Sequence, residues 1–243
     1  MPRTSIVTLT QDRPDYLAEA IASVEAQTDS DWEHLVYDNG SRDPRVLEIL
    51  REAKGRNPDR FFFTSPGGRG PVVPALYWNI LLGLARGRYL TILDDDNRKH
   101  PHFLERMTTP MEALVSVDAV SCGWQCIDAG GNVTALWHLN QHTSIPVLVR
   151  SNTIDSNALV FRRSVLDKIG LFSVDLGACE DWHFTIRLAR YCTIQHLSEA
   201  LIDYREHVNA RSQTVSQGAL ERVWNRIRTE MFTAEERLSV GEE

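Results

Sequence analysis

The chain is poor in cysteine, and its cysteines are badly spaced for a zinc site. The four of them stand at positions 122, 126, 179 and 192 of 243 residues, without a paired Cys-x-x-Cys pattern. Small buried or half-buried thiols in a reducing compartment are the simpler interpretation. The cysteines therefore do not predict a structural metal centre.

Long apolar runs are also absent. The longest candidate, Asn79–Leu84, is far shorter than the ~18 uninterrupted apolar residues that a membrane-spanning helix needs. Met1–Ser5 leads directly into an expected strand, without the apolar region of a signal peptide. We therefore predict a cytoplasmic protein without a transmembrane segment.

Positive charge is outweighed by negative charge, because 26 Lys and Arg residues stand against 33 Asp and Glu residues and the formal net charge is −7. This balance argues against a protein that binds polyanions in general. The length and the 42% hydrophobic content are ordinary for a soluble protein. They suffice for one domain with a sizeable core.

Several well-known nucleotide-binding and catalytic motifs are missing. The glycines of Gly67–Gly70 do not follow the first expected strand and lack the G-x-G-x-x-G spacing, which argues against a dehydrogenase. There is no G-x-x-x-x-G-K-[ST] loop, so a P-loop NTPase is disfavoured. A Gly-x-Ser-x-Gly elbow is absent too.

The first hundred residues contain a regular alternation of strand and helix patterns. Strands are expected at Ser5–Thr10, His34–Tyr37, Arg60–Ser65 and Arg88–Leu93. Helices are expected at Pro14–Ala26, from Asp43-Pro44 onward and at Pro74–Ala85. This alternation implies right-handed crossovers, and therefore a Rossmann-like, mainly parallel sheet in an α/β fold.

The second half has a mixed pattern. A hairpin is expected from Ala119–Ile127 and Val133–His138 around the turn Asp128–Asn132. The further expected elements are a strand at Asn157–Phe161, a helix at Asp181–Arg190, strands at Thr193–Leu197 and Leu201–Arg205, a helix beyond Ser212 and a tail from Glu235. We predict a parallel front half fused to a mixed back half.

An apolar run, Tyr89–Leu93, ends abruptly in Asp94, Asp95 and Asp96. Three acids cannot continue a buried strand without a large desolvation cost, so they are expected at the rim of the sheet, where open α/β sheets bind ligands. A hard divalent cation is a natural partner for carboxylates that repel one another, and a helix cap is the alternative. Asp38 ends the second strand at the same edge, in an Asx-type turn or a ligand contact.

Two later segments offer further polar groups. Glu180 and Asp181 open a helix, where they either cap it or form a general-base pair in a cleft. Trp182 is either a stacking surface for a sugar ring or part of the core. His207 follows the last strand, as a structural residue or as an imidazole ligand of an ion such as Mn²⁺.

Taken in order, these motifs resemble those of the inverting family-2 glycosyltransferases of the GT-A fold. The resemblance covers roughly residues 4–212, and it rests on the order and spacing of these motifs taken together. The matching segments are Ser5–Arg13, Ser23–Thr28 with Trp32–Glu33, Asp38–Asp43, Asn79–Gly87 leading to Asp94–Asp96, Ser156–Phe172, Glu180–Arg187 and Tyr204–His207. Leu9 departs from the usual Pro, and Gln11–Asp12 from the usual Tyr-Asn, which bears on donor recognition.

The resemblance implies transfer of a sugar, with inversion, from a nucleotide diphosphate sugar, most simply a UDP-sugar, to an acceptor hydroxyl. It implies Mn²⁺ or Mg²⁺ held by Asp96 and His207, proton removal by Asp181, a tuning or positioning role for Glu180, and an acceptor contact at Trp182. Contacts with the donor are implied for Thr8, Leu9, Thr10, Asp12, Asp38, Arg69, Asp94 and Asp95.

On this resemblance the single domain 1–243 comprises a nucleotide-binding half at 1–97, an acceptor and catalytic half at 98–212, and a C-terminal helix and tail at 213–243. The acceptor stays open among a glycan, a lipid-linked intermediate, a small molecule, a protein and a modified nucleic acid. A catalytically silent nucleotide-sugar-binding module is the alternative function. A sugar-nucleotide pyrophosphorylase is disfavoured, because residues 9–16 contain no glycine.

Overall fold

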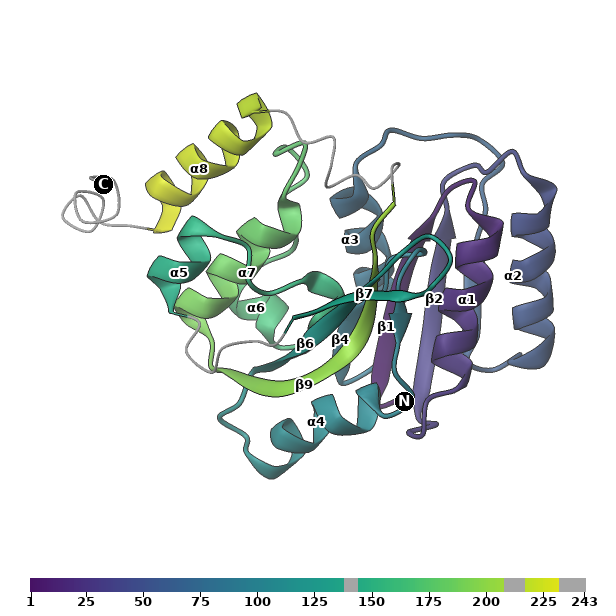
Figure 1. The fold of residues 1–243 in the computed structure, drawn as a ribbon, viewed down its shortest axis with the longest axis horizontal. Helices are drawn as coiled ribbons and strands as arrows, with labels where there is room; N and C mark the ends of the chain where they lie inside the picture. Colours follow the sequence, from purple (N-terminus) through teal and green to yellow (C-terminus); the bar gives the residue numbers. More distant parts are fainter. Residues whose placement is uncertain (138–143, 208–216, 232–243) are drawn as a thin grey trace.

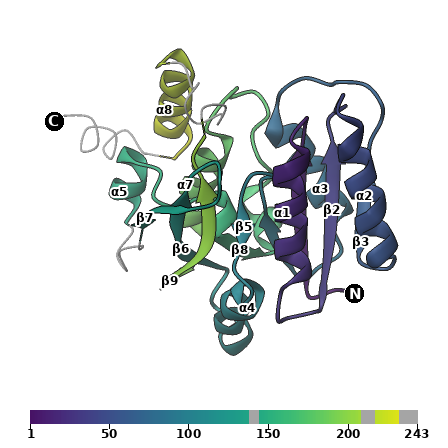
Figure 2. The same ribbon diagram turned by 45° about the vertical axis from the view of Figure 1, so that its right-hand side comes forward.

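A single curved sheet forms the centre of the molecule, and helices cover both of its faces (Figures 1 and 2). The computed structural model describes residues 1–137, 144–207 and 217–231. Within these ranges the sheet follows the order β3-β2-β1-β4-β8-β6-β9-β5, and β7 pairs with β6. The strands are β1 (Thr4–Thr10), β2 (Trp32–Asp38), β3 (Phe61–Thr64), β4 (Tyr89–Ile92), β5 (Arg98–Lys99), β6 (Ala119–Ile127), β7 (Val133–Trp137), β8 (Leu159–Arg162) and β9 (Ile194–Arg205).

Two groups of helices enclose the sheet. They are α1 (Pro14–Glu25), α2 (Pro44–Arg56), α3 (Pro74–Leu84), α4 (Phe103–Ala113), α5 (Ile145–Arg150), α6 (Val165–Ile169), α7 (Glu180–Tyr191) and α8 (Gln217–Met231), with a short 3-10 helix η1 (Ser156–Ala158). The buried clusters place α1, α2 and α4 on one face and α3, α5, α6, α7 and α8 on the other. None of the helices described is long and apolar enough to cross a membrane.

The front half has the predicted architecture. Strands β3, β2, β1 and β4 are parallel neighbours, and α1, α2 and α3 each begin with a proline directly after a strand and its loop. Proline is favoured there because its fixed φ angle suits the first helical turn and its missing N–H is not needed. The second strand begins at Trp32, two residues before the predicted His34.

In the back half, β5, α4, α5 and α6 are not among the predicted elements, and two predicted elements differ from the structure. The two predicted strands at 193–197 and 201–205 are one long strand, β9, because register shifts in its pairing with β6 absorb the residues between them. The predicted strand at Asn157 begins only at Leu159, because Asp155 caps a 3-10 turn by accepting the Asn157 N–H at 2.8 Å. The predicted tail from Glu235 lies outside the described residues.

The strand directions bring several chain segments to one edge. β6 and β8 are antiparallel, as are β8 and β4, whereas β9 is parallel to β6. The carboxyl ends of β1, β2, β4 and β9 therefore point the same way, toward the upper edge of the molecule in Figure 1. In open α/β sheets this edge is where ligands bind.

Candidate active site

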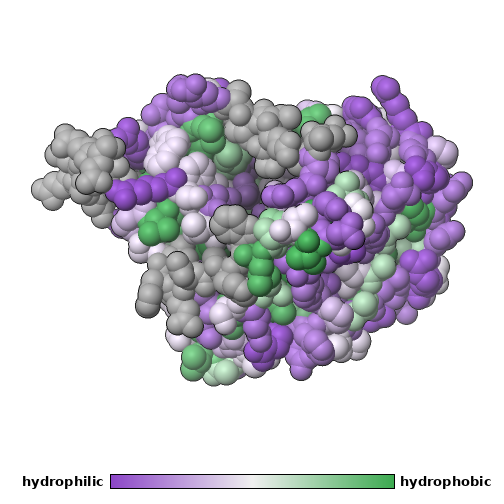
Figure 3. Space-filling model, in the orientation of Figure 1, coloured by the Kyte–Doolittle hydropathy of each residue, from purple (hydrophilic) through white to green (hydrophobic). Residues whose placement is uncertain are grey.

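A cavity of about 790 Å³ opens at this edge of the sheet. Seven of the residues predicted to act on the donor, the metal or the acceptor line it, namely Leu9, Thr10, Asp94, Asp95, Asp96, Glu180 and Asp181. The space-filling view shows a hollow in this face, with hydrophilic residues gathered around it (Figure 3). The structure thus brings the acidic triplet and the Glu-Asp pair to one cavity, although they are far apart in the sequence.

Asp94 is fixed by a single neighbouring side chain. The Asp94 N–H donates to Asn157 Oδ1 at 2.6 Å, and Asn157 Nδ2 donates to Asp94 Oδ2 at 2.9 Å. Burial and the Asp96 carboxylate raise the pKa of Asp94 to about 8, although the bond from Asn157 favours the ionised form. The geometry of Asp94 therefore depends on Asn157, which lies in η1 two residues before β8 begins.

Asp95 and Asp96 share a cation that belongs to the protein. Arg13 Nη1 donates to Asp95 Oδ1 at 3.0 Å and to Asp96 Oδ2 at 2.6 Å, and Thr10 Oγ1 donates to Asp95 Oδ2 at 2.8 Å. Burial and Asp96 raise the pKa of Asp95 to about 6, against the stabilising effect of Arg13. Arg13 thus compensates part of the repulsion among the acids.

Asp96 and His207 lie side by side at the ends of β4 and β9. His207 Nε2 is 3.0 Å from Asp96 Oδ2, and Arg205 Nε donates to the Asp96 carbonyl at 2.9 Å. A carboxylate next to an imidazole can ligate a transition-metal ion such as Mn²⁺, whereas Mg²⁺ would use chiefly the carboxylate oxygens. No group of three or more such side chains gathers to hold an ion within the described ranges, so further ligands would come from water or a bound diphosphate.

Asp181 is placed at the opening of α7. Asn152 Nδ2 donates to Asp181 Oδ2 at 3.1 Å, and Glu180 beside it is buried. Burial, together with the carboxylates of Asp155 and Glu180, raises the pKa of Asp181 to about 6. A carboxylate with this pKa is ionised at neutral pH and is still a useful proton acceptor.

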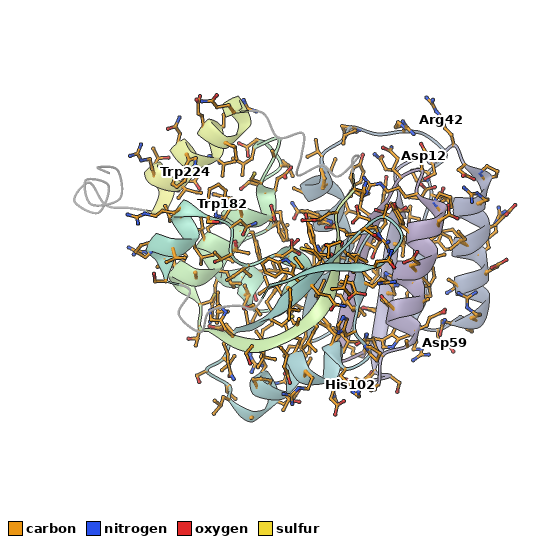
Figure 4. All side chains as sticks on the ribbon, viewed as in Figure 1. Asp12, Arg42, Asp59, His102, Trp182 and Trp224 are labelled. Atoms are coloured by element: carbon orange, nitrogen blue, oxygen red, sulfur yellow. The ribbon has the colours of Figure 1, made fainter. Side chains whose placement is uncertain are left out.

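Asp12 and Arg69 bind each other rather than facing the cavity. The Arg69 guanidinium forms an ion pair with Asp12, whose Oδ1 also accepts the N–H groups of Arg42 and Asp43. Asp12 adopts a left-handed φ of 55°, and it lies near Arg42 at the upper right of Figure 4. The pair therefore ties together the loops that follow β1, β2 and β3.

Asp38 is committed to a turn. Its Oδ1 accepts the N–H and the hydroxyl of Ser41 at 2.9 and 2.6 Å, and its Oδ2 accepts Ser65 Oγ at 2.7 Å. Gly40, with a φ of +70°, lies so close to the backbone of Gly68 that an added Cβ would be 2.5 Å from it. Only glycine fits this close approach, which seats the Gly-rich loop on the turn.

Two predicted contact residues lie in the core. Thr8 is fully buried, with Oγ1 at 2.9 Å from His34 Nε2. Trp182 donates from Nε1 to the Leu148 carbonyl at 2.6 Å and packs edge-on against Trp224, on the side away from Asp12 (Figure 4). Neither lines the cavity, so each is placed to support the site through packing.

Three residues of the site carry no predicted role, namely Arg13, Asn152 and Asn157. Arg13 lies in the loop after β1, at the same edge as the acids, and this position is the signal that marks it. Asn152 and Asn157 carry no comparable signal, because an asparagine in a loop or at the end of an expected strand is most often a turn residue. Their importance follows only from the carboxylates that they contact.

Comparison with known proteins agrees with this architecture. The O-antigen biosynthesis protein RfbC of Myxococcus xanthus is 27% identical over 220 residues, which are 90% of this chain but only 17% of RfbC. The crystal structure of S. aureus TarS 1-349 in complex with UDP-GlcNAc has a TM-score of 0.73 at 18% identity, covering 98% of this chain and 70% of that one. The mannosyltransferase PcManGT from Pyrobaculum calidifontis, in complex with GDP-Man and Mn²⁺, has a TM-score of 0.65 at 15% identity, covering 98% and 68%.

These similarities confirm the predicted fold and family. The likeness to TarS and PcManGT shows the fold, a mixed α/β structure of the GT-A type. The sequence match is of a different kind, since residues 5–170, more than half of the chain, match the model of a protein family. The chain belongs to glycosyl transferase family 2.

Proposed function

We propose that this chain is a metal-dependent inverting glycosyltransferase that moves a sugar from a UDP-sugar to an acceptor hydroxyl. The observation that carries the proposal is one cavity lined both by the acidic triplet and by Asp181. The triplet, with His207 beside it, suits a metal and a diphosphate, whereas Asp181 suits a general base. The UDP-GlcNAc bound to TarS and the Mn²⁺ bound with GDP-Man to PcManGT support the nature of the donor and of the ion.

In this proposal, different residues remove the acceptor proton and bind the metal ion. Asp181 takes the proton of the acceptor hydroxyl, while Asn152 and Glu180 hold it in place. Asp96 and His207 would hold Mn²⁺ or Mg²⁺, which supplies positive charge for the leaving diphosphate. Inversion requires attack from the side opposite the leaving group, and the two sets of acids sit on different elements around the same cavity.

The proposed donor contacts are of two kinds. Leu9, Thr10, Asp94 and Asp95 line the cavity and would contact the donor directly. The other predicted donor residues would act indirectly, by holding the strands and loops around the cavity through the bonds described above. They are Thr8, Asp12, Asp38 and Arg69. We also propose one domain over 1–243, with a nucleotide-binding half at 1–97, an acceptor half at 98–212 and a C-terminal helix and tail at 213–243, because one sheet runs through both halves.

A thermal-shift screen tests the proposal directly. With Mn²⁺ present, we expect UDP at 100 times its Kd to stabilise the protein by about 2.7 kcal/mol, which corresponds to a rise in Tm of roughly 5–11 °C for a chain of this size. GDP, CDP and ADP are the comparison ligands, and EDTA is the control for the metal. A protein that none of these nucleotides stabilises, with or without Mn²⁺, would contradict the proposed function.

The pKa of Asp181 predicts how transfer depends on pH. A general base must be ionised, and with a pKa of about 6 Asp181 becomes protonated as the pH falls. We expect kcat/KM to fall about tenfold per pH unit below pH ~6 and to be level above it. Asn152 stabilises the ionised form, so Asn152→Ala is expected to move this acidic limb to higher pH. A profile unchanged in Asn152→Ala would show that another group titrates.

A further inference from the structure

Arg13 occupies a particular place among the acids of the cavity. It stands at the N-terminus of α1, its side chain is 30% exposed, and it lines the cavity. Its Nη1 lies 3.0 Å from Asp95 Oδ1 and 2.6 Å from Asp96 Oδ2. The cation that neutralises these carboxylates in the free protein is therefore a side chain of the protein itself.

The contact with Asp96 is made through the oxygen that faces His207. Asp96 Oδ2 lies 2.6 Å from Arg13 Nη1 and 3.0 Å from His207 Nε2. A divalent cation held by Asp96 and His207 would need the same lone pairs. Because two cations repel at such distances, a metal on this oxygen opposes the contact between the Arg13 guanidinium and Asp96.

The charge on Arg13 is firmly held. A guanidinium stays protonated in proteins whether or not it is paired with a carboxylate. Once displaced, the guanidinium remains a full positive charge in the cavity that we assign to the diphosphate. Its planar fork of N–H donors matches phosphate oxygens better than a lysine would.

We infer that Arg13 changes partners when the enzyme is loaded: it pairs with Asp95 and Asp96 in the free protein and with the donor diphosphate once a divalent cation takes Asp96. The inference rests on the proposed function and deepens it. The consequence is that binding of the metal and binding of the diphosphate are coupled. Metal alone must displace Arg13 from Asp96 while the guanidinium gains no new partner. Metal and diphosphate together give the guanidinium a new partner, and each therefore raises the affinity for the other.

Titration with Mn²⁺ alone, followed by EPR of the free ion, tests the first half of the inference. Arg13→Gln removes the competing charge, so we expect it to bind Mn²⁺ about tenfold more tightly than the wild type. Arg106→Gln is the matched control, because Arg106 also pairs with a carboxylate, Glu199, but on the exposed surface. It should bind Mn²⁺ as the wild type does.

Repeating the titration with UDP present tests the second half. UDP should raise the affinity for Mn²⁺ strongly in the wild type and at least tenfold less in Arg13→Gln, whose side chain has no charge to give the diphosphate. Melting curves establish that each variant is folded. If Arg13→Gln does not fold, Arg13→Lys replaces it, and its single short ammonium should give a two- to fivefold gain in affinity for Mn²⁺ alone.

The outcomes separate this inference from the proposed function. Equal Mn²⁺ affinity in the wild type and Arg13→Gln, or no Mn²⁺ binding by either, would overturn the exchange of partners even if UDP binds and transfer occurs. An equal effect of UDP in both proteins would overturn it as well. Failure of every nucleotide to bind counts against the proposed function, whereas tighter Mn²⁺ binding by Arg13→Gln would still support competition at Asp96.

Discussion

Asp181→Asn is expected to reduce sugar transfer by roughly 10²–10⁴-fold, the usual contribution of a general base. The amide has almost the same shape as the carboxylate and can still accept the bond from Asn152, but it cannot take up the proton of the acceptor. Donor binding should therefore stay within about threefold of the wild type. Initial rates of UDP release with acceptor, and calorimetric titration of UDP with Mn²⁺, measure the two effects separately.

The control for this variant removes a comparable charge elsewhere. Asp15 also lies in the first turn of a helix, α1, but its side chain is 79% exposed and pairs with Arg45. Asp15→Asn should leave transfer nearly unchanged, which separates loss of the base from loss of an acid at a helix N-terminus. Unimpaired transfer by Asp181→Asn would refute the assignment. A wild-type protein that binds the donor but neither transfers nor hydrolyses it would indicate a silent binding module.

Asn157→Ala is expected to cost about 3–5 kcal/mol of stability, the largest single effect on folding that we predict near the site. The side chain of this almost fully buried residue contacts two carboxylates, Asp94 and Asp155, and accepts the Asp94 N–H. A hydrogen bond contributes about 0.5–3 kcal/mol, the most where one partner is charged. The alanine removes three such bonds, which leaves the Asp155 carboxylate with the bond from the Asn157 N–H. Lys99 Nζ donates to the Asn157 carbonyl at 2.7 Å, a bond that the variant keeps.

Thermal and urea denaturation measure this effect, which corresponds to a fall in Tm of roughly 6–20 °C. Asn132 provides the comparison, because its amide also donates to a carboxylate, Asp128, but in an exposed hairpin turn. Asn132→Ala should cost less than about 1 kcal/mol. If Asn157→Ala were as stable as Asn132→Ala, the hydrogen bonds of Asn157 with Asp94 and Asp155 would contribute little to stability. If Asn157→Ala lost stability but kept full transfer, its role would be structural alone.

The front half could be predicted from the sequence because its signals are local. Apolar runs end in turn residues, and a proline opens each following helix, so strand and helix limits are set within a few neighbouring residues. The back half contains elements that exist only through long-range pairing. Arg98–Lys99 forms a strand because it pairs with Ile202 and Asp203, and two residues carry no periodic pattern. β9 is continuous because bulges in its pairing with β6 absorb its polar middle.

The site shows the same division. Asp94–Asp96, Glu180 and Asp181 could be found because acids at the end of a buried strand or the start of a helix stand out from their neighbours. Arg13 and Asn157 carry no predicted role, since their partners lie 82 and 63 residues away in the sequence, although the position of Arg13 after β1 places it at the same edge as the acids. Trp182 illustrates the opposite difficulty, because a tryptophan beside an acid pair suits a ligand surface and a core equally well.

The position of β9 in the sheet has a consequence for the order in which the protein folds. The parallel strands of the front half are connected by short crossovers, whereas Asp96 and His207 are separated by 111 residues. Contacts of such high sequence separation form late, because the chain entropy of closing a long loop must be overcome first. On the ribosome, where the N-terminal part emerges first, we expect a folded front half that carries the acidic triplet but lacks its partner from β9. On the proposed function, the site for metal and donor is then complete only after His207 has been synthesised and β9 has paired with the sheet.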